Sequence, residues 1–379
     1  MVQFASPFPL EDFHDRLRRV QEVLRARNVD WAILDEPETM GWLSGYVTTE
    51  NLWRAVIVPD SGQPFLLLRS LDAAPARHRT WIDRIVTFLD WEDPIEVLMK
   101  HFPAGENGKV RIGIEFQSNS MTQARVLALK HKLSDAGFVD LERSTWDLRR
   151  IKSAHEIAHM RRGSQILDEV VREVVAAIRP GIKQREIAAI AAAAYYRLGF
   201  DDGFIGHITA STGWDSLHGF MTDEPLGDGQ VVHIELLPRF KNYTVRIMRS
   251  VVVGAATDEQ KGIFAQLCEL QDQQLAAMKP GALASDVDAI MRVGALQKNL
   301  RPSYDNITGY TLGYNSSASQ RLSDLHRNFS PKASWPIERD MVFHMYASAG
   351  GLAVSETVLV TDGGGERLTQ TPRVIFEAK

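Results

Sequence analysis

One carboxylate in this 379-residue sequence lies where a charge is costly. Glu235 falls within "VVHIELLPRFKNYTVRIMRSVVVG", residues 231–254, a stretch that predicts two strands around a polar turn. Burying a carboxylate costs several kcal/mol unless a partner compensates the charge, so Glu235 is a candidate functional residue. A carboxylate placed against an electrophilic carbon can act as a nucleophile, which divides one difficult displacement into two easier ones.

Such a reaction also moves protons, and histidine is the side chain that titrates nearest to neutral pH. The candidates are His207 in "FIGHITAST", His218 in "TGWDSLHGFMTDEPL", and two strand residues, His233 and His344. His233 lies two residues before Glu235 and therefore on the same face of its predicted strand. For each of these histidines the alternative is a hydrogen-bonded residue of the core.

The elements that position these residues fall into two predicted domains. Helical spacing predicts a helix over 10–26, and short strands are predicted in "DWAILDEPETMGWLSGY", "RAVIVPD", "PFLLLRS", "RIVTFLDW" and "RIGIEFQS". A helix near 121–136 follows, and a long helical pattern begins after "FVDLERSTWDLRRIKS". We therefore predict a smaller α/β domain over residues 1–148 and a second domain over 149–379.

The second domain contains an internal duplication. "VAAIRPG" at 175–181 is echoed by "LAAMKPG" at 275–281, and each predicts a helix that ends at Pro-Gly before another helix. "GDGQVVHIELL" from residue 227 is answered by "IERDMVFHMYA" from residue 337, each a turn that leads into a buried strand. Two such copies predict a pseudo-twofold α+β domain whose sheet halves face one cleft.

Composition excludes several classes of function. The formal charge of −5 and the lack of a Lys/Arg-rich run with interleaved aromatic residues argue against nucleic-acid binding. The single cysteine, Cys268, rules out an internal disulfide framework and predicts a small core residue. We find no signal-peptide pattern and no run near the roughly 18 apolar residues of a membrane span, so we expect a cytoplasmic protein with no membrane partner.

Several motifs resemble those of the pita-bread superfamily of methionine aminopeptidase, prolidase and creatinase. They are "GDGQVVHIE", "TGYTLGY", "RDMVFHMY" and "SETVLVTDGGGERLT", in an order that covers nearly the whole chain. The resemblance implies a pita-bread C-terminal domain after a smaller creatinase-type N-terminal α/β domain. Most members of the superfamily, which includes family M24, are dinuclear metallopeptidases whose ligands are two Asp, one His and two Glu.

At those five ligand positions this chain carries other residues. They are, in chain order, Glu235, Arg246, Tyr310, Tyr346 and Ser355, with Glu356 one place further along the last strand. A guanidinium cannot bind a metal ion, and neighbouring strand residues point to opposite faces, so Glu356 replaces the last ligand only if a bulge intervenes. The resemblance therefore implies that the dinuclear site is lost, and we expect neither a metal nor another cofactor.

Two branches of the superfamily work without that site, and this chain is similar to both. The closer similarity is to ectoine hydrolase, through "HIELLPRFKNYTVRIMRS", "TGYTLGY", "VFHMY" and "VSETVLV". It implies a metal-independent hydrolase of a non-peptide C–N bond in a small amidine, guanidine or cyclic amide, with Glu235 as nucleophile. Since His218 falls where creatinase has its catalytic histidine, the resemblance makes it the general acid/base.

The other polar residues are expected to bind the substrate. Arg246 either pairs with Glu235 and keeps it ionised or clamps a substrate carboxylate, and the alternative is that it points to solvent. Tyr310 and Tyr346 are expected to hydrogen-bond the substrate. The remaining candidate substrate-binding residues are His207, His344 and Glu356.

Creatinase-like enzymes are dimers in which the N-terminal domain of one subunit reaches the other's cleft with an aromatic residue and an arginine. Here "TTENLWRAVIV" offers Trp53 and Arg54, so the resemblance implies a homodimer that acts on a small molecule.

Three alternatives remain open. One is a non-hydrolytic enzyme, performing cyclisation or elimination with the same Glu and His, and another is a catalytically inactive binding protein derived from a metallopeptidase. A functional metallopeptidase is the third. The substrate is left open because "NSSASQRLSDLHRNFSPKASW" and the turn "LPRFKN" differ from the ectoine hydrolase pattern.

Overall fold

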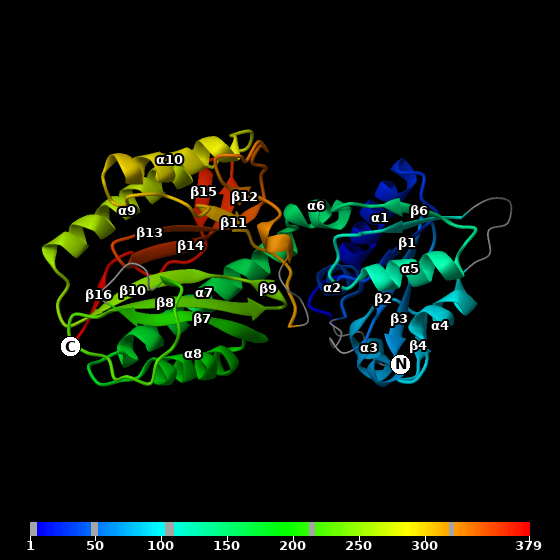
Figure 1. Ribbon diagram of the computed structural model, residues 1–379, viewed down its shortest axis with the longest axis horizontal. Helices are drawn as coiled ribbons and strands as arrows, with labels where there is room; N and C mark the ends of the chain where they lie inside the picture. The colour runs from blue at the N-terminus through cyan, green and yellow to red at the C-terminus, as the bar shows by residue number, and fades with distance from the viewer. Residues whose placement is uncertain (1–5, 47–51, 103–109, 212–216, 318–321) are drawn as a thin grey trace. The chain divides into compact units, whose positions relative to one another are not determined.

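The computed structural model describes residues 6–46, 52–102, 110–211, 217–317 and 322–379, which form two compact units (Figure 1). One unit comprises Met1–Arg149 with Tyr314–Arg321, and the other comprises Arg150–Gly313 with Leu322–Lys379. The division thus follows Arg149, next to the predicted boundary at 148. The grouping of the segment from Tyr314 with the first unit is not evident from the sequence pattern.

In its described residues the first unit contains a six-stranded mixed sheet in the order β4-β3-β2-β1-β5-β6, with helices along the chain between the strands. Its strands are β1 (Trp31–Leu34), β2 (Ala55–Pro59), β3 (Phe65–Arg69), β4 (Ile85–Phe88), β5 (Arg111–Ile114) and β6 (Gly137–Asp140). Its helices are α1 (Leu10–Ala26), α2 (Pro37–Ser44), α3 (Ala73–Arg79), α4 (Pro94–His101), α5 (Gln123–Lys132) and α6 (Ser144–Arg150). The helix predicted over 10–26 is confirmed as α1.

One local prediction in this unit is wrong. The stretch "DWAILDEPETMGWLSGY" is a strand only over β1, and its second half forms helix α2. Pro37 occupies the first turn of α2, where no N–H is needed, and Gly45 ends the helix in the left-handed conformation with φ of 77°. These two signals outweigh the apolar run that suggested a strand.

A cluster of buried acids surrounds Arg149 in the first unit. Arg149 contacts Glu36 at 3.2 Å and Glu38 at 3.1 Å. Burial raises the pKa of Asp35 to about 6 and that of Glu115 to about 7. For Glu36, burial and then the neighbouring charge of Glu38 raise the pKa to about 8. At neutral pH this cluster therefore holds protons that the unfolded chain would release.

This cluster predicts that stability falls as pH rises. The stabilisation is complete below about pH 4, where the same acids titrate in the unfolded chain, and is lost as pH passes through the folded pKa values. We expect the free energy of unfolding of the full chain, measured in urea by tryptophan fluorescence, to decrease between pH 5 and pH 9. Glu36→Gln should flatten this slope, whereas the exposed-site control Glu11→Gln should leave it unchanged. An equal slope in both variants would contradict the assignment.

The second unit is built on a ten-stranded sheet among the described residues, with a main path in the order β12-β11-β13-β14-β10-β8-β7. The strands are β7 (Asp202–Ser211), β8 (Val231–Phe240), β9 (Tyr243–Thr244), β10 (Ile247–Val253), β11 (Gly309–Thr311), β12 (Asn328–Phe329), β13 (Val342–Ala349), β14 (Leu352–Thr361), β15 (Gly364–Arg367) and β16 (Phe376–Ala378). The helices are α7 (Ala154–Ala177), α8 (Gln184–Leu198), α9 (Asp258–Ala277) and α10 (Ala284–Gln297). Figure 1 shows α7 and α8 beside β7 and β8, and α9 and α10 on the β13 side of the sheet.

The predicted duplication is confirmed by matching hydrogen bonds in the two halves. After α7, the N–H of Gly181 donates to the carbonyl of Leu226 at 2.8 Å; after α9, that of Gly281 donates to Ile337 at 2.8 Å. Both glycines have positive φ, 85° and 89°, which a residue with a Cβ rarely adopts. The Pro-Gly ends therefore anchor each helix pair to the turn that enters a central strand.

No helix among the described residues combines the length and the apolar character needed to cross a bilayer.

Candidate active site

Strand register brings a row of polar side chains onto one face of the larger sheet. Glu235 on β8 lies opposite Met248 on β10, which pairs in turn with Ser355 on β14. Ser355 lies opposite Tyr346 on β13. Directly paired antiparallel residues share a face, so Glu235, Ser355 and Tyr346 face the same side. We call this side the polar face.

The next row on the polar face lies two residues along each strand. Its members are Arg246, Thr357, His344 and Tyr310: the N–H of Arg246 donates to Thr357 Oγ1 at 2.8 Å, and His344 pairs with both Thr357 and Tyr310. Thr357 and His344 are fully buried. A sheet face this rich in polar groups fits a binding site better than an apolar core.

A β-bulge in β7 places His207 against Glu235. The register shifts between Ile205 and Ile208, so that both Gly206 and His207 oppose Glu235. A Cβ at Gly206 would meet the carbonyl oxygen of Glu235 at 2.6 Å and its Cγ at 2.9 Å. Glycine is therefore needed for this close approach, and the bulge aims His207 at the carboxylate.

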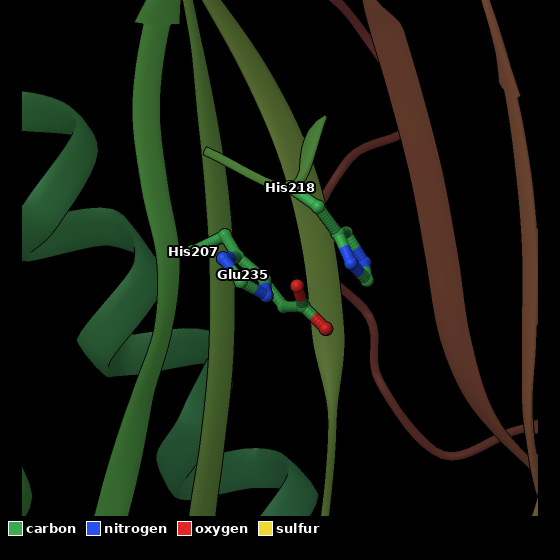
Figure 2. Close-up of side chains that lie close together, drawn as sticks. All are labelled: His207, His218 and Glu235. Carbon is green, nitrogen blue, oxygen red and sulfur yellow. The ribbon is translucent and has the colours of Figure 1, made fainter. Parts of the chain in front are cut away.

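His207, His218 and Glu235 converge in one cluster (Figure 2). One ligand atom from each lies within 4.8 Å of the others, and the two imidazole rings stack with centroids 4.3 Å apart. His207 is half-buried, His218 is exposed and Glu235 is buried. No other group of three or more His, Cys, Asp or Glu side chains in the described chain is close enough to hold one metal ion. Two imidazoles beside a carboxylate can also transfer protons at neutral pH.

The carboxylate of Glu235 forms an ion pair with Arg246. Arg246 Nη2 contacts Glu235 Oε1; the side chains are 11% and 0% exposed. The alternative in which Arg246 points to solvent is therefore wrong. Its guanidinium also lies 5.3 Å from the ring centroid of Tyr310. Arg246 therefore supplies a charge partner for the buried carboxylate of Glu235.

His233, which the sequence places on the face of Glu235, is a further neighbour of this carboxylate. Its Nε2 lies 3.7 Å from Glu235 Oε2, and neither ring nitrogen has a hydrogen-bond partner among the described residues.

Aromatic residues form the part of the polar face that lies on β11 and β13. The ring of Tyr346 stacks on that of His344 at 5.2 Å, and Tyr310 packs edge-on against both. Asn306 Nδ2 donates to the Tyr346 hydroxyl at 3.3 Å. Burial raises the pKa of Tyr346, and the Asn306 hydrogen bond and the charge of Arg246 oppose this rise. Tyr346 is therefore a neutral hydroxyl donor at physiological pH.

Glu356 is not part of the polar face. Strands β13 and β14 pair without a register shift, so Glu356, beside Ser355, points to the other side. There it accepts a hydrogen bond from Arg249 Nη2 at 2.9 Å and one from Thr369 Oγ1. Arg249 is fully buried and also donates to backbone carbonyls, including that of Ser355. The geometry makes Glu356 the partner of a structural arginine and gives no support to a role in substrate binding.

Trp53 and Arg54 are buried within the first unit. Trp53 Nε1 donates to Asp35 Oδ2 at 2.8 Å. Trp53 is 4% exposed and Arg54 is 7% exposed. The side chain of Trp53 is thus held by its own domain. The role predicted for them in a partner's cleft stays a prediction.

Two features of the site escaped the sequence analysis. The bulge at Gly206 is one, and an isolated glycine within a strand pattern is its signal. The other is Asn306, which precedes "TGYTLGY" and carries no pattern of its own. Its link to Tyr346 depends on a loop that only the fold brings to β13.

Two family models and several known proteins match this chain. Residues 158–362 match metallopeptidase family M24, and residues 16–151 match the creatinase/prolidase N-terminal domain. An Xaa-Pro dipeptidase of Pyrococcus furiosus is 24% identical over 96% of this chain and 99% of its own. An ectoine hydrolase of Halomonas elongata is 25% identical over 99% of this chain and 100% of its own.

Solved structures share the fold. A prolidase from Thermococcus sibiricus superposes with a TM-score of 0.83 at 20% identity, covering 97% of this chain and 99% of its own. The prolidase from Pyrococcus horikoshii gives a TM-score of 0.80 at 22% identity, over 95% of this chain and 99% of its own. The fold class predicted from the sequence is thereby confirmed.

Proposed function

Because the chain belongs to metallopeptidase family M24, a family of hydrolases, we propose that it hydrolyses a non-peptide C–N bond in a small amidine, guanidine or cyclic amide. Glu235 is the nucleophile and His218 the general acid/base. The observation that carries this proposal is a buried carboxylate paired with Arg246 while two imidazoles lie close to it. The ectoine hydrolase relative supports a non-peptide C–N bond.

In the proposed reaction a Glu235 oxygen attacks the electrophilic carbon of the substrate. The C–N bond breaks, and His218 donates a proton to the departing nitrogen, which leaves the substrate carbon bound to Glu235 as a mixed anhydride or, for an amidine or guanidine, as its imino analogue. His218 then removes a proton from water, which attacks the intermediate and restores the carboxylate. The hydroxyls of Tyr346 and Tyr310, whose rings pack against each other on the polar face, hydrogen-bond the substrate in this proposal.

The family description implies metal ions, and the residues present do not fit a two-metal centre. The one close group of potential ligands in the described residues contains a single carboxylate, and that carboxylate already contacts a guanidinium. A cation beside the carboxylate disfavours two further cations. We therefore propose that the reaction proceeds without the dinuclear site.

A second candidate is the hydrolysis of an Xaa-Pro dipeptide with one metal ion. Two observations favour it: the ligand atoms of His207, His218 and Glu235 lie within 4.8 Å of one another, and one relative is named Xaa-Pro dipeptidase. Two histidines and one carboxylate are a common ligand set for a transition metal.

Metal removal separates the two candidates. We expect protein dialysed against EDTA, with its metal content measured by inductively coupled plasma mass spectrometry, to retain its rate on a panel of amidines, guanidines and cyclic amides. Xaa-Pro dipeptides should not be cleaved before or after the treatment. A loss of at least ~100-fold that added Zn²⁺, Mn²⁺ or Co²⁺ restores would favour the second candidate instead.

The homodimer and the cytoplasmic location stay predictions. Analytical ultracentrifugation of the purified chain decides the first.

A further inference from the structure

The arginines close to the polar face differ in how their charge is balanced. Arg246 pairs with Glu235, and Arg249, behind the sheet, pairs with Glu356. Arg292, on α10, pairs with Asp288 at 2.6 Å. Each of these cations therefore has a carboxylate partner within the protein.

Arg301 is the exception. Its Nη1 donates to Asn306 Oδ1 at 3.0 Å and to Ser348 Oγ at 3.4 Å, and its guanidinium lies 4.3 Å from the ring centroid of Tyr304. All three partners are neutral, and among the described residues Arg301 forms no ion pair. The side chain is half-buried, so its charge is partly removed from water without a counter-charge.

The contacts of Arg301 connect it to Tyr346 on the polar face. Ser348 lies two residues from Tyr346 on β13 and shares its face. Asn306, which accepts from Arg301, donates through Nδ2 to the Tyr346 hydroxyl at 3.3 Å. The charges of Arg246 and Arg301 oppose the rise in the pKa of Tyr346, and the charge of Glu235 adds to it.

We infer that Arg301 binds a carboxylate group of the substrate, so that the substrate is a small anionic molecule with its reactive C–N bond directed at Glu235. The inference rests on the proposed function for the position of that bond. Only Nη1 of Arg301 is engaged by side chains that the structure describes, so the rest of the fork is open to a carboxylate. Arg292 Nη2 also donates to Asn306, through its backbone carbonyl at 2.9 Å, but Arg292 is paired with Asp288. Of these two described arginines, Arg301 thus carries the single uncompensated positive charge, which suits one negative charge better than a phosphate.

Matched probe pairs test this inference. One pair is 4-guanidinobutyrate and its neutral amide 4-guanidinobutyramide; the other is pyroglutamate and pyroglutamamide. We expect the carboxylate member of at least one pair to bind at least ~10-fold more tightly in calorimetric and ligand-observed NMR titrations. In Arg301→Gln, which keeps a donor toward Asn306, the ratio should fall to about 1, whereas Arg301→Lys should keep part of it.

The control is Arg339→Gln, which removes an exposed arginine paired with Asp362 in the same domain and should preserve the ratio. Equal affinity within both pairs, absence of binding by either carboxylate, or a ratio that survives in Arg301→Gln would overturn the inference. Hydrolysis is followed separately by ammonia release and mass spectrometry. A preference for carboxylates without turnover would refute the proposed function alone, and turnover without that preference would refute the inference alone.

Discussion

Replacing Glu235 with glutamine is expected to lower kcat/KM on the substrate by at least ~10³-fold, since an amide cannot serve as the nucleophile. Gln keeps the size of the side chain, so the sheet and the bulge at Gly206 should be preserved. Wild-type protein quenched during turnover should show, by intact mass, an adduct of the acyl fragment on the peptide that contains residue 235. That adduct should be absent from Glu235→Gln.

The matched control for this result is Glu224→Gln, an exposed carboxylate outside the polar face, which should keep wild-type rates. An adduct that persists in Glu235→Gln, or a rate within ~10-fold of wild type, would show that the nucleophile is another group. If the rate falls but no adduct is ever trapped, Glu235 acts as a general base toward water, and the covalent step is wrong.

Replacing Glu356 with alanine is expected to reduce the free energy of unfolding by about 3–5 kcal/mol, because it leaves the guanidinium of Arg249 buried without a charge partner. Both side chains of this pair are 0% exposed. Urea denaturation of the full chain measures the effect. The activity of the protein that remains folded should stay within a few-fold of wild type, since Glu356 lies on the far side of the sheet from Glu235.

Glu366→Ala is the control, because it breaks an ion pair with Arg161 in which both side chains are about 40% exposed and should cost at most ~1 kcal/mol. A stable Glu356→Ala variant that had lost substrate affinity would return Glu356 to the list of substrate-binding residues. Glu356→Gln should lie between wild type and alanine, since the amide oxygen can still accept from Arg249.

Part of the site could be read from local sequence rules. The pairing of Arg246 with Glu235 is one of two roles that the sequence predicts for this arginine, and it depends on two strands joined by a short turn. Alternation along a strand also raised the question of whether Ser355 or Glu356 faces Tyr346. The answer needed the register of β13 against β14, which is continuous. A single bulge there would have reversed the assignment.

The sequence by itself determined the elements whose signals are local. Helix α1 follows from apolar spacing, and the two halves of the second unit follow from repeated Pro-Gly helix ends, since both depend on contacts between residues close in the chain. The presence of a costly carboxylate at 235 is visible in the same way. What surrounds that carboxylate is not.

Only the tertiary structure decided which residues surround Glu235. His207 reaches it through a register shift in β7, His218 lies close to it without belonging to a strand of the sheet, and Arg301 approaches Tyr346 through Asn306. Each of these contacts joins residues that are distant in the chain or separated by irregular backbone. Their geometry arises from cross-strand packing and loop closure, which no periodicity in the sequence encodes.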